Sequence, residues 1–228
     1  MSTFRRDKVK CCVCGKPSEE MTCMSTNAFS YADLDFRPPH SMRSTMFMTM
    51  KLCPKCGYAD SRTLGWSSLE NIKEIVYSEE YQNLFKTLPP VKNGLKAYLC
   101  AYLDEIKGNH RRAIEHYKMA AWGFDCPNEE CQKVTKKCRK KTMELMEKYD
   151  DPCHSFEYGP VYIDFKRRNG DFIGALDAIK KFRPSAIHRE NMDKWIKFER
   201  ELCKNKDTDR HTCEEYMEEG YRKSVLNR

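Results

Sequence analysis

The chain has 228 residues, of which 40% are hydrophobic and 33% are charged, and its formal net charge is +7. This length suffices to bury a core, and the hydrophobic fraction excludes a wholly disordered chain. No apolar run approaches the roughly 18 residues of a membrane span, and the start "MSTFRRDKVK" lacks the apolar core of a signal peptide. We therefore expect a cytoplasmic protein that does not enter a membrane.

The 13 cysteines are a high and odd number for a chain of this length. Without an export signal we expect reduced thiols, some bound to metal and others buried as small hydrophobic groups. Residues 1–65 hold ten Lys or Arg against six Asp or Glu, and the remainder of the chain is nearly balanced. Four thiolates on one divalent ion would halve the N-terminal excess, so composition alone does not predict a basic face.

Two short segments near the N-terminus, residues 11–15 and 53–57, share a Cys-x-x-Cys-Gly pattern. Two residues between the cysteines let both thiolates reach one ion from a tight turn, and the glycine relieves crowding where backbone amides point at sulfur. We therefore expect two hairpins whose tips supply one structural zinc site, with iron or a redox dithiol pair as alternatives. The predicted zinc ligands are Cys11, Cys14, Cys53 and Cys56.

Other cysteines offer weaker alternatives. Cys12 adjoins Cys11 and could replace it as a ligand, although its spacing to Cys14 is too short for the usual knuckle. A second metal site is a further alternative, but a simpler interpretation is that these thiols are buried. The residues of that second site would be Cys126, Cys131 and Cys138, joined by Cys153 or His154.

The segment between the two knuckles contains "DLDFRPPHSMRSTM". At strand spacing, Asp33 and Asp35 share a face, where Arg37 or Arg43 could hold them in charge-assisted pairs. One interpretation is that this network orders a long loop around the metal. The alternatives are a recognition loop for a cationic or phosphorylated group, and an enzyme site that also uses His40.

The composition and periodicity of the sequence change near Gly65, after which apolar residues recur at helical spacing. Ser67 and Glu70 have the spacing of a capping box, which predicts that helices begin there. A helix of about six turns is expected from the region of Pro127 to just before Asp151. These features indicate two domains, a zinc-knuckle module over residues 1–65 and a helical domain over residues 66–228.

A weak internal repeat occurs in the helical part. Gly108 and Gly170 each follow a helical segment and precede an alanine at the fifth position, Ala113 and Ala175. Glycine permits the left-handed turn at a helix end, and the small alanine lets two helices approach closely. We therefore expect a mainly α fold of irregular, tetratricopeptide-like helical hairpins, with a third pair in residues 191–206 and 212–223.

The chain resembles a family of uncharacterised prokaryotic proteins with paired CxxC knuckles around an Asp-Leu-Asp-x-Arg-Pro segment. The resemblance rests on residues 33–46 and "CPKCGYA" at 53–59. It continues over residues 78–84, 120–126, 163–172 and 209–216. The resemblance implies a zinc knuckle followed by tetratricopeptide-like helices, without an established activity.

Residue by residue, the resemblance assigns the four predicted zinc ligands to the family's presumed metal site. It also assigns Asp33, Asp35, Arg37 and Arg43 to the family's central motif. The doubled thiol of Cys11 and Cys12 departs from the family pattern.

The sequence has no phosphate-binding loop, dinucleotide fingerprint, zinc-protease motif or nucleophile elbow. We therefore expect a non-enzymatic zinc-binding adaptor or scaffold whose helical surface binds a protein or peptide. The principal alternative is a nucleic-acid-binding zinc-ribbon protein, and a further one is an enzyme built on the Asp33, Asp35, Arg37 and Arg43 loop.

Overall fold

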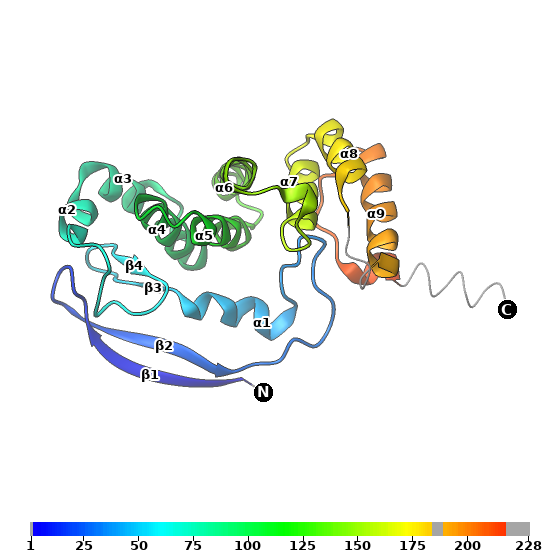
Figure 1. The fold of residues 1–228 in the computed structure, drawn as a ribbon. Helices are drawn as coiled ribbons and strands as arrows, with labels where there is room; N and C mark the ends of the chain where they lie inside the picture. The colour runs from blue at the N-terminus through cyan, green and yellow to red at the C-terminus, as the bar shows by residue number, and fades with distance from the viewer. Residues whose placement is uncertain (1, 184–188, 218–228) are drawn as a thin grey trace. The chain divides into compact units, whose positions relative to one another are not determined.

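The computed structural model describes residues 2–183 and 189–217, and it is mainly helical with two small antiparallel sheets (Figure 1). The chain forms two compact units. Unit 1 comprises Met1–Asn27 and Ser41–Thr142, and unit 2 comprises Ala28–His40 and Met143–Arg228. Over the described ranges, none of the helices is both long and apolar enough for a membrane span.

This division differs from the expected boundary at residue 65. The helices that follow Gly65 belong to the same unit as the cysteine hairpins, because they pack around the second knuckle. The segment 28–40 belongs to the other unit, because its backbone pairs with residues near the C-terminus. The change in composition and periodicity near Gly65 therefore does not coincide with a boundary between the two units.

Two hairpins carry the predicted knuckles in unit 1 (Figure 1). Strand β1 (Thr3–Lys10) pairs with β2 (Pro17–Ser25), and the pairing of Lys10 with Pro17 closes on the first knuckle. Strand β3 (Lys51–Leu52) pairs with β4 (Ala59–Asp60) around the second. The prediction of two hairpins with cysteines at their tips is confirmed.

The helices that follow Gly65 begin later than the sequence predicts. The hydroxyl of Ser67 accepts a hydrogen bond from the Leu69 N–H at 3.2 Å, which closes a local turn, and the next helix starts only at Ile72. The predicted start at Ser67 is therefore wrong. Short helices α1 (His40–Thr45) and η1 (Met46–Thr49) precede β3. The later ones are α2 (Ile72–Tyr77), α3 (Glu79–Thr87), α4 (Lys92–Ile106) and α5 (His110–Phe124). Helix α6 (Glu129–Tyr149) begins in unit 1 and ends in unit 2, since the boundary lies between Thr142 and Met143.

The α4–α5 hairpin forms as predicted. Gly108 has a φ of 69°, and the next amide, of Asn109, donates to the Asp104 carbonyl at 2.9 Å, which ends α4 in a left-handed turn. The Asn109 side chain then caps α5 by accepting from the Arg112 N–H. Ala113 is fully buried in the interface, as its spacing predicts.

Helices α4 and α5 approach each other closely at two glycines, Gly94 and Gly123. A Cβ added to Gly123 would lie 2.5 Å from the backbone nitrogen of Gly94 and 2.6 Å from its Cα. We expect Gly123→Ala to destabilise unit 1 by about 3 kcal/mol, because backbone rather than a flexible side chain must move. Gly108→Ala is the control, since its Cβ meets no atom within 4 Å and costs only about 1 kcal/mol for the positive φ. Equal losses in urea unfolding would contradict this assignment.

In unit 2, the α7–α8 hairpin repeats the turn of α4–α5. Gly170 has a φ of 88°, the Asp171 amide donates to the Lys166 carbonyl at 2.9 Å, and the Asp171 side chain caps α8. Ala175 is buried like its counterpart. The elements of this unit are η2 (Pro152–His154), α7 (Gly159–Arg168), α8 (Phe172–Lys181) and α9 (Arg189–Lys204).

The third predicted helix pair is observed in part. Helix α9 covers most of its first member, and residues 213–217 form helical turns within the second, whose remainder lies outside the described residues. Two equivalent glycine turns do not by themselves establish a tetratricopeptide array. The structure supports a mainly helical fold with two hairpins of the same design.

Candidate metal centre

The two knuckles have the same backbone geometry. In each, the glycine amide donates to the carbonyl of the first cysteine at 2.9 Å, from Gly15 to Cys11 and from Gly57 to Cys53. Both glycines have positive φ, 71° and 78°, which other residues adopt only with strain. The glycine after each cysteine pair is therefore required by the turn.

The structure brings the four predicted thiols together. The sulfurs of Cys11 and Cys56 are 3.8 Å apart, those of Cys14 and Cys53 are 3.6 Å apart, and all four lie within 4.8 Å of one another. A tetrahedral ion with metal–sulfur bonds of about 2.3 Å separates its sulfurs by about 3.8 Å. The spacing thus fits a four-thiolate set, and this group can hold a metal ion.

Burial makes two of these thiols, Cys11 and Cys56, difficult to ionise without a cation. It raises the pKa of Cys11 to about 11 and that of Cys56 further, although backbone N–H groups directed at both sulfurs oppose the shift. Burial also raises the pKa of Cys14, but the Lys16 amide and the neighbouring thiols outweigh it and leave a lowered pKa. A divalent ion would compensate the clustered negative charge, so its binding is coupled to proton release.

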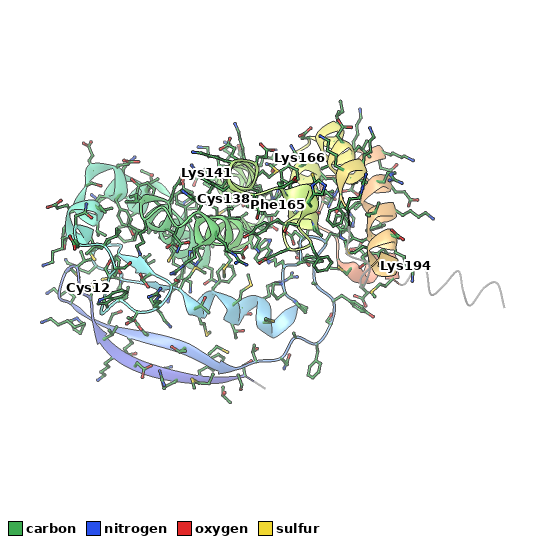
Figure 2. All side chains as sticks on the ribbon, viewed as in Figure 1. Cys12, Cys138, Lys141, Phe165, Lys166 and Lys194 are labelled. Carbon is green, nitrogen blue, oxygen red and sulfur yellow. The ribbon has the colours of Figure 1, made fainter. Side chains whose placement is uncertain are left out.

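The structure distinguishes between Cys11 and Cys12. The Cys11 sulfur belongs to the group, whereas the Cys12 sulfur does not. Cys12, labelled in Figure 2, instead anchors the knuckle through its backbone, because its N–H donates to the Leu64 carbonyl at 2.7 Å. Of the two adjacent cysteines, Cys11 is therefore the candidate metal ligand and Cys12 is not.

Helix α3 holds the second knuckle in place through contacts that the sequence did not predict. The Tyr81 hydroxyl donates to the Gly57 carbonyl at 2.8 Å, and the Gln82 amide donates to the Cys56 carbonyl at 3.0 Å. The Phe85 ring fills the space beside Gly57, where a Cβ would lie 2.6 Å from it. Both hydrogen-bonding side chains lie within residues 78–84, which carry part of the family resemblance. That resemblance was the one feature of the sequence that could have indicated a role for this segment at the knuckle.

The predicted recognition loop is divided between the two units. Asp33, Asp35 and Arg37 lie in unit 2, and Arg43 lies in helix α1 within unit 1. Both carboxylates are buried, with exposures of 1% and 0%. The expected acidic pair is therefore inside the fold rather than on a surface.

Arginines from the C-terminal region face the two carboxylates. Arg168 approaches Asp35 at 3.5 Å, and Arg210 approaches Asp33 at 3.8 Å. The backbone amide of Arg37 donates to Asp35 at 3.2 Å. These contacts bring cations from distant parts of the chain to the two buried carboxylates, in addition to the nearby arginines that the sequence suggested.

Backbone contacts also attach this segment to the rest of unit 2. Asp33 forms an antiparallel bridge with Thr212, and the Leu34 amide donates to the His211 carbonyl at 3.0 Å. The Leu34 carbonyl accepts from the indole N–H of the fully buried Trp195 at 3.2 Å. The structure thus favours the interpretation that the segment orders the fold, although it orders unit 2 rather than the metal site.

The four-cysteine group is the one potential metal cluster among the residues that the structure describes. The second site considered around Cys126, Cys131 and Cys138 is not assembled there. Cys131 and Cys138 are buried on α6, as expected for small hydrophobic side chains.

Comparisons with known proteins add no relative: no family model, curated protein or solved structure matches the chain significantly. The resemblance to the knuckle-containing family therefore stays a prediction.

Proposed function

We propose that the four thiols bind one zinc ion whose role is structural. The observation that carries this proposal is the near-tetrahedral spacing of sulfurs from two separate hairpin tips. Zinc suits a set of four thiolates without any redox requirement. Four protein ligands fill the coordination shell, so no position is left for a catalytic water.

We further propose that the protein is a non-enzymatic adaptor that binds a protein or peptide. The supporting surface is the β1–β2 hairpin, which forms a two-stranded sheet and exposes Phe4, Met21 and Met24. Exposed apolar side chains on a narrow ribbon are suited to pairing with a partner segment. The observation that favours binding therefore lies on this ribbon rather than on the helices.

The buried carboxylates support a role without catalysis. Asp33 and Asp35 face arginines inside unit 2, where substrate access is poor. Their charges serve the fold, which counts against an enzyme built on this loop.

Nucleic-acid binding is the second candidate, and one observation favours it. The basic side chains of Arg5, Arg6, Lys8 and Lys10 are exposed along β1, beside the exposed ring of Phe4. Cations next to an aromatic ring are typical of nucleic-acid surfaces. Binding of this kind weakens steeply with salt, whereas capture through apolar contacts does not.

Affinity capture from a native lysate tests both candidates. We expect the double variant Phe4→Ser/Met24→Ser to lose at least about 90% of a captured protein that cross-links to residues 3–25, with unchanged zinc content. The control Ile173→Ser removes an apolar side chain from α8 that is even more exposed than Phe4 and Met24, and it should retain capture. Capture that nuclease or moderate salt abolishes would favour nucleic acid, and capture unaffected by the double variant would contradict the ribbon as the binding surface.

A further inference from the structure

Unit 1 contains a half-open pocket of about 570 Å³. Strands β1 and β2, helix η1, strand β3 and the first turn of α4 contribute to its walls. This volume lies within the range of small-molecule sites. Part of the lining is apolar and rich in flexible methionines, which adapt to ligands of different shape: Met21, Met48, Met50, Leu52 and Leu64.

The ammonium group of Lys96 is the unusual feature of this pocket. The side chain lines the pocket and is only 7% exposed. Within the described ranges it has no hydrogen-bond acceptor and no carboxylate in contact. The stem of the side chain is buried, whereas the ammonium nitrogen is not among the fully buried polar atoms that lack a partner, so it keeps access to the pocket and can donate to a ligand there.

A nearby buried lysine shows the contrasting arrangement. Lys51 also lines the pocket, but its ammonium donates to the carbonyls of Met21 at 2.7 Å and Met48 at 2.8 Å. It also donates to the Thr22 hydroxyl at 3.2 Å, which uses all three of its protons. Lys51 contributes charge to the pocket, whereas Lys96 retains donors for a ligand.

The surrounding charges favour an anion. Four basic side chains line the pocket, Arg6, Lys51, Lys92 and Lys96, against the acidic Glu19 and Glu20. The Glu20 carboxylate already accepts hydrogen bonds from the Leu64 amide at 2.6 Å and from Thr63 at 3.3 Å. The negative charge of Glu20 is therefore partly satisfied by Thr63 and Leu64, which reduces its opposition to a bound anion.

The N-terminus of α4 adds to the positive electrostatic potential of the pocket. Lys92 and Asn93 of its first turn line the pocket, and that turn contains no acidic residue. Val91 precedes the helix and provides no side-chain cap for its amides. The positive end of a 15-residue helix thus adjoins the pocket without an internal counter-charge.

We propose that this pocket binds a small organic anion, an apolar body with one carboxylate or phosphate group whose oxygens contact the ammonium of Lys96. The methionines and leucines would contact the apolar body, and Lys92 and Arg6 would add long-range attraction. The site is separate from the cysteine cluster and does not depend on the proposed adaptor role.

Calorimetric titration of the zinc-loaded full chain with octanoate, octyl phosphate and neutral 1-octanol tests the proposal. We expect one or both anions to bind, and Lys96→Met to weaken that binding by about tenfold or more, since a charged hydrogen-bonding partner is lost. Lys73→Met, an exposed lysine on α2, makes the same substitution and should leave binding unchanged. The two anions distinguish carboxylate from phosphate preference. Failure of both to bind, equal binding of octanol, or an unaffected Lys96→Met variant would overturn the proposal.

A second measurement uses the wild-type chain and so does not depend on how the variant folds. Burial, followed by the charge of Lys92, lowers the pKa of Lys96 to about 8. A bound anion favours the protonated form, so saturating octanoate should raise this pKa, and affinity should fall as the pH rises above 8. Carbon-13 NMR of the lysine side chains reports the titration. An unchanged pKa in the presence of saturating octanoate and octyl phosphate would overturn the proposal.

Discussion

Replacing Cys53 with serine is expected to abolish zinc binding and to disorder both knuckles of unit 1. Cys53 lies in the four-sulfur group, 3.6 Å from the Cys14 sulfur, and three thiolates cannot complete a closed tetrahedral site. Because metal binding is coupled to folding, we expect the free energy of unfolding to fall by more than about 4 kcal/mol. Metal content per chain and thermal unfolding with and without chelator provide the measurement.

The matched control is Cys12→Ser. It removes a thiol adjacent to the candidate ligand Cys11 and keeps the Cys12 backbone hydrogen bond to Leu64. One zinc per chain and near-normal stability are expected for this variant. The proposal is wrong if the wild type purifies without metal and unfolds at the same temperature in chelator, or if the two cysteine variants behave alike.

Replacing Arg167 with methionine is expected to have the second largest effect, on unit 2. The Arg167 side chain is completely buried, and its guanidinium donates to Asp164 at 2.6 Å and to Glu199 at 2.9 Å. It also donates to the backbone carbonyls of Asp207 and Asp209. The substitution removes the cation that Glu199 contacts and leaves Asp164 with only the more distant Arg168, at 3.9 Å, which costs about 3–5 kcal/mol.

This loss should depend on pH. Burial, together with the charge of Asp164, raises the pKa of Glu199 in the folded protein, and the charge of Arg167 opposes that rise. A raised carboxyl pKa means that the folded state holds its proton longer than the unfolded state, so stability falls as the pH rises above about 4.3. Removing Arg167 raises the pKa further, so the stability deficit should be larger at pH 7.5 than at pH 5.

Denaturant unfolding at the two pH values measures this dependence. Lys180→Met is the control, because its pair with Asp177 at 2.8 Å is solvent-exposed and contributes little to stability. Adding Glu199→Gln to Arg167→Met should recover part of the loss and remove most of the pH dependence. A deficit below about 1 kcal/mol, or one equal at both pH values, would refute the role assigned to Arg167.

Local spacing determined the parts of the structure that were predicted correctly. The Cys-x-x-Cys-Gly pattern specifies its own turn, because both thiols and the positive-φ glycine lie within five residues. The glycine turns of α4–α5 and α7–α8, and the extent of α6, follow equally short signals of helix ending, capping and apolar periodicity.

The predicted helix start at Ser67 was wrong because the serine side chain has a second local use. Ser67 has the spacing of a helix cap, but its hydroxyl closes a turn with Leu69, and α2 begins at Ile72. The spacing alone does not distinguish these two uses of one hydroxyl group.

The tertiary structure alone decided which distant segments meet. Asp33 and Asp35 lie between the two knuckles in the sequence, yet they pack in unit 2, where Leu34 contacts Trp195. The support of the second knuckle by α3 and the unpaired ammonium of Lys96 are likewise products of packing. The physical reason is that turns and helix ends are specified by backbone conformation over a few residues, whereas burial and charge pairing depend on side chains that only the complete fold brings together.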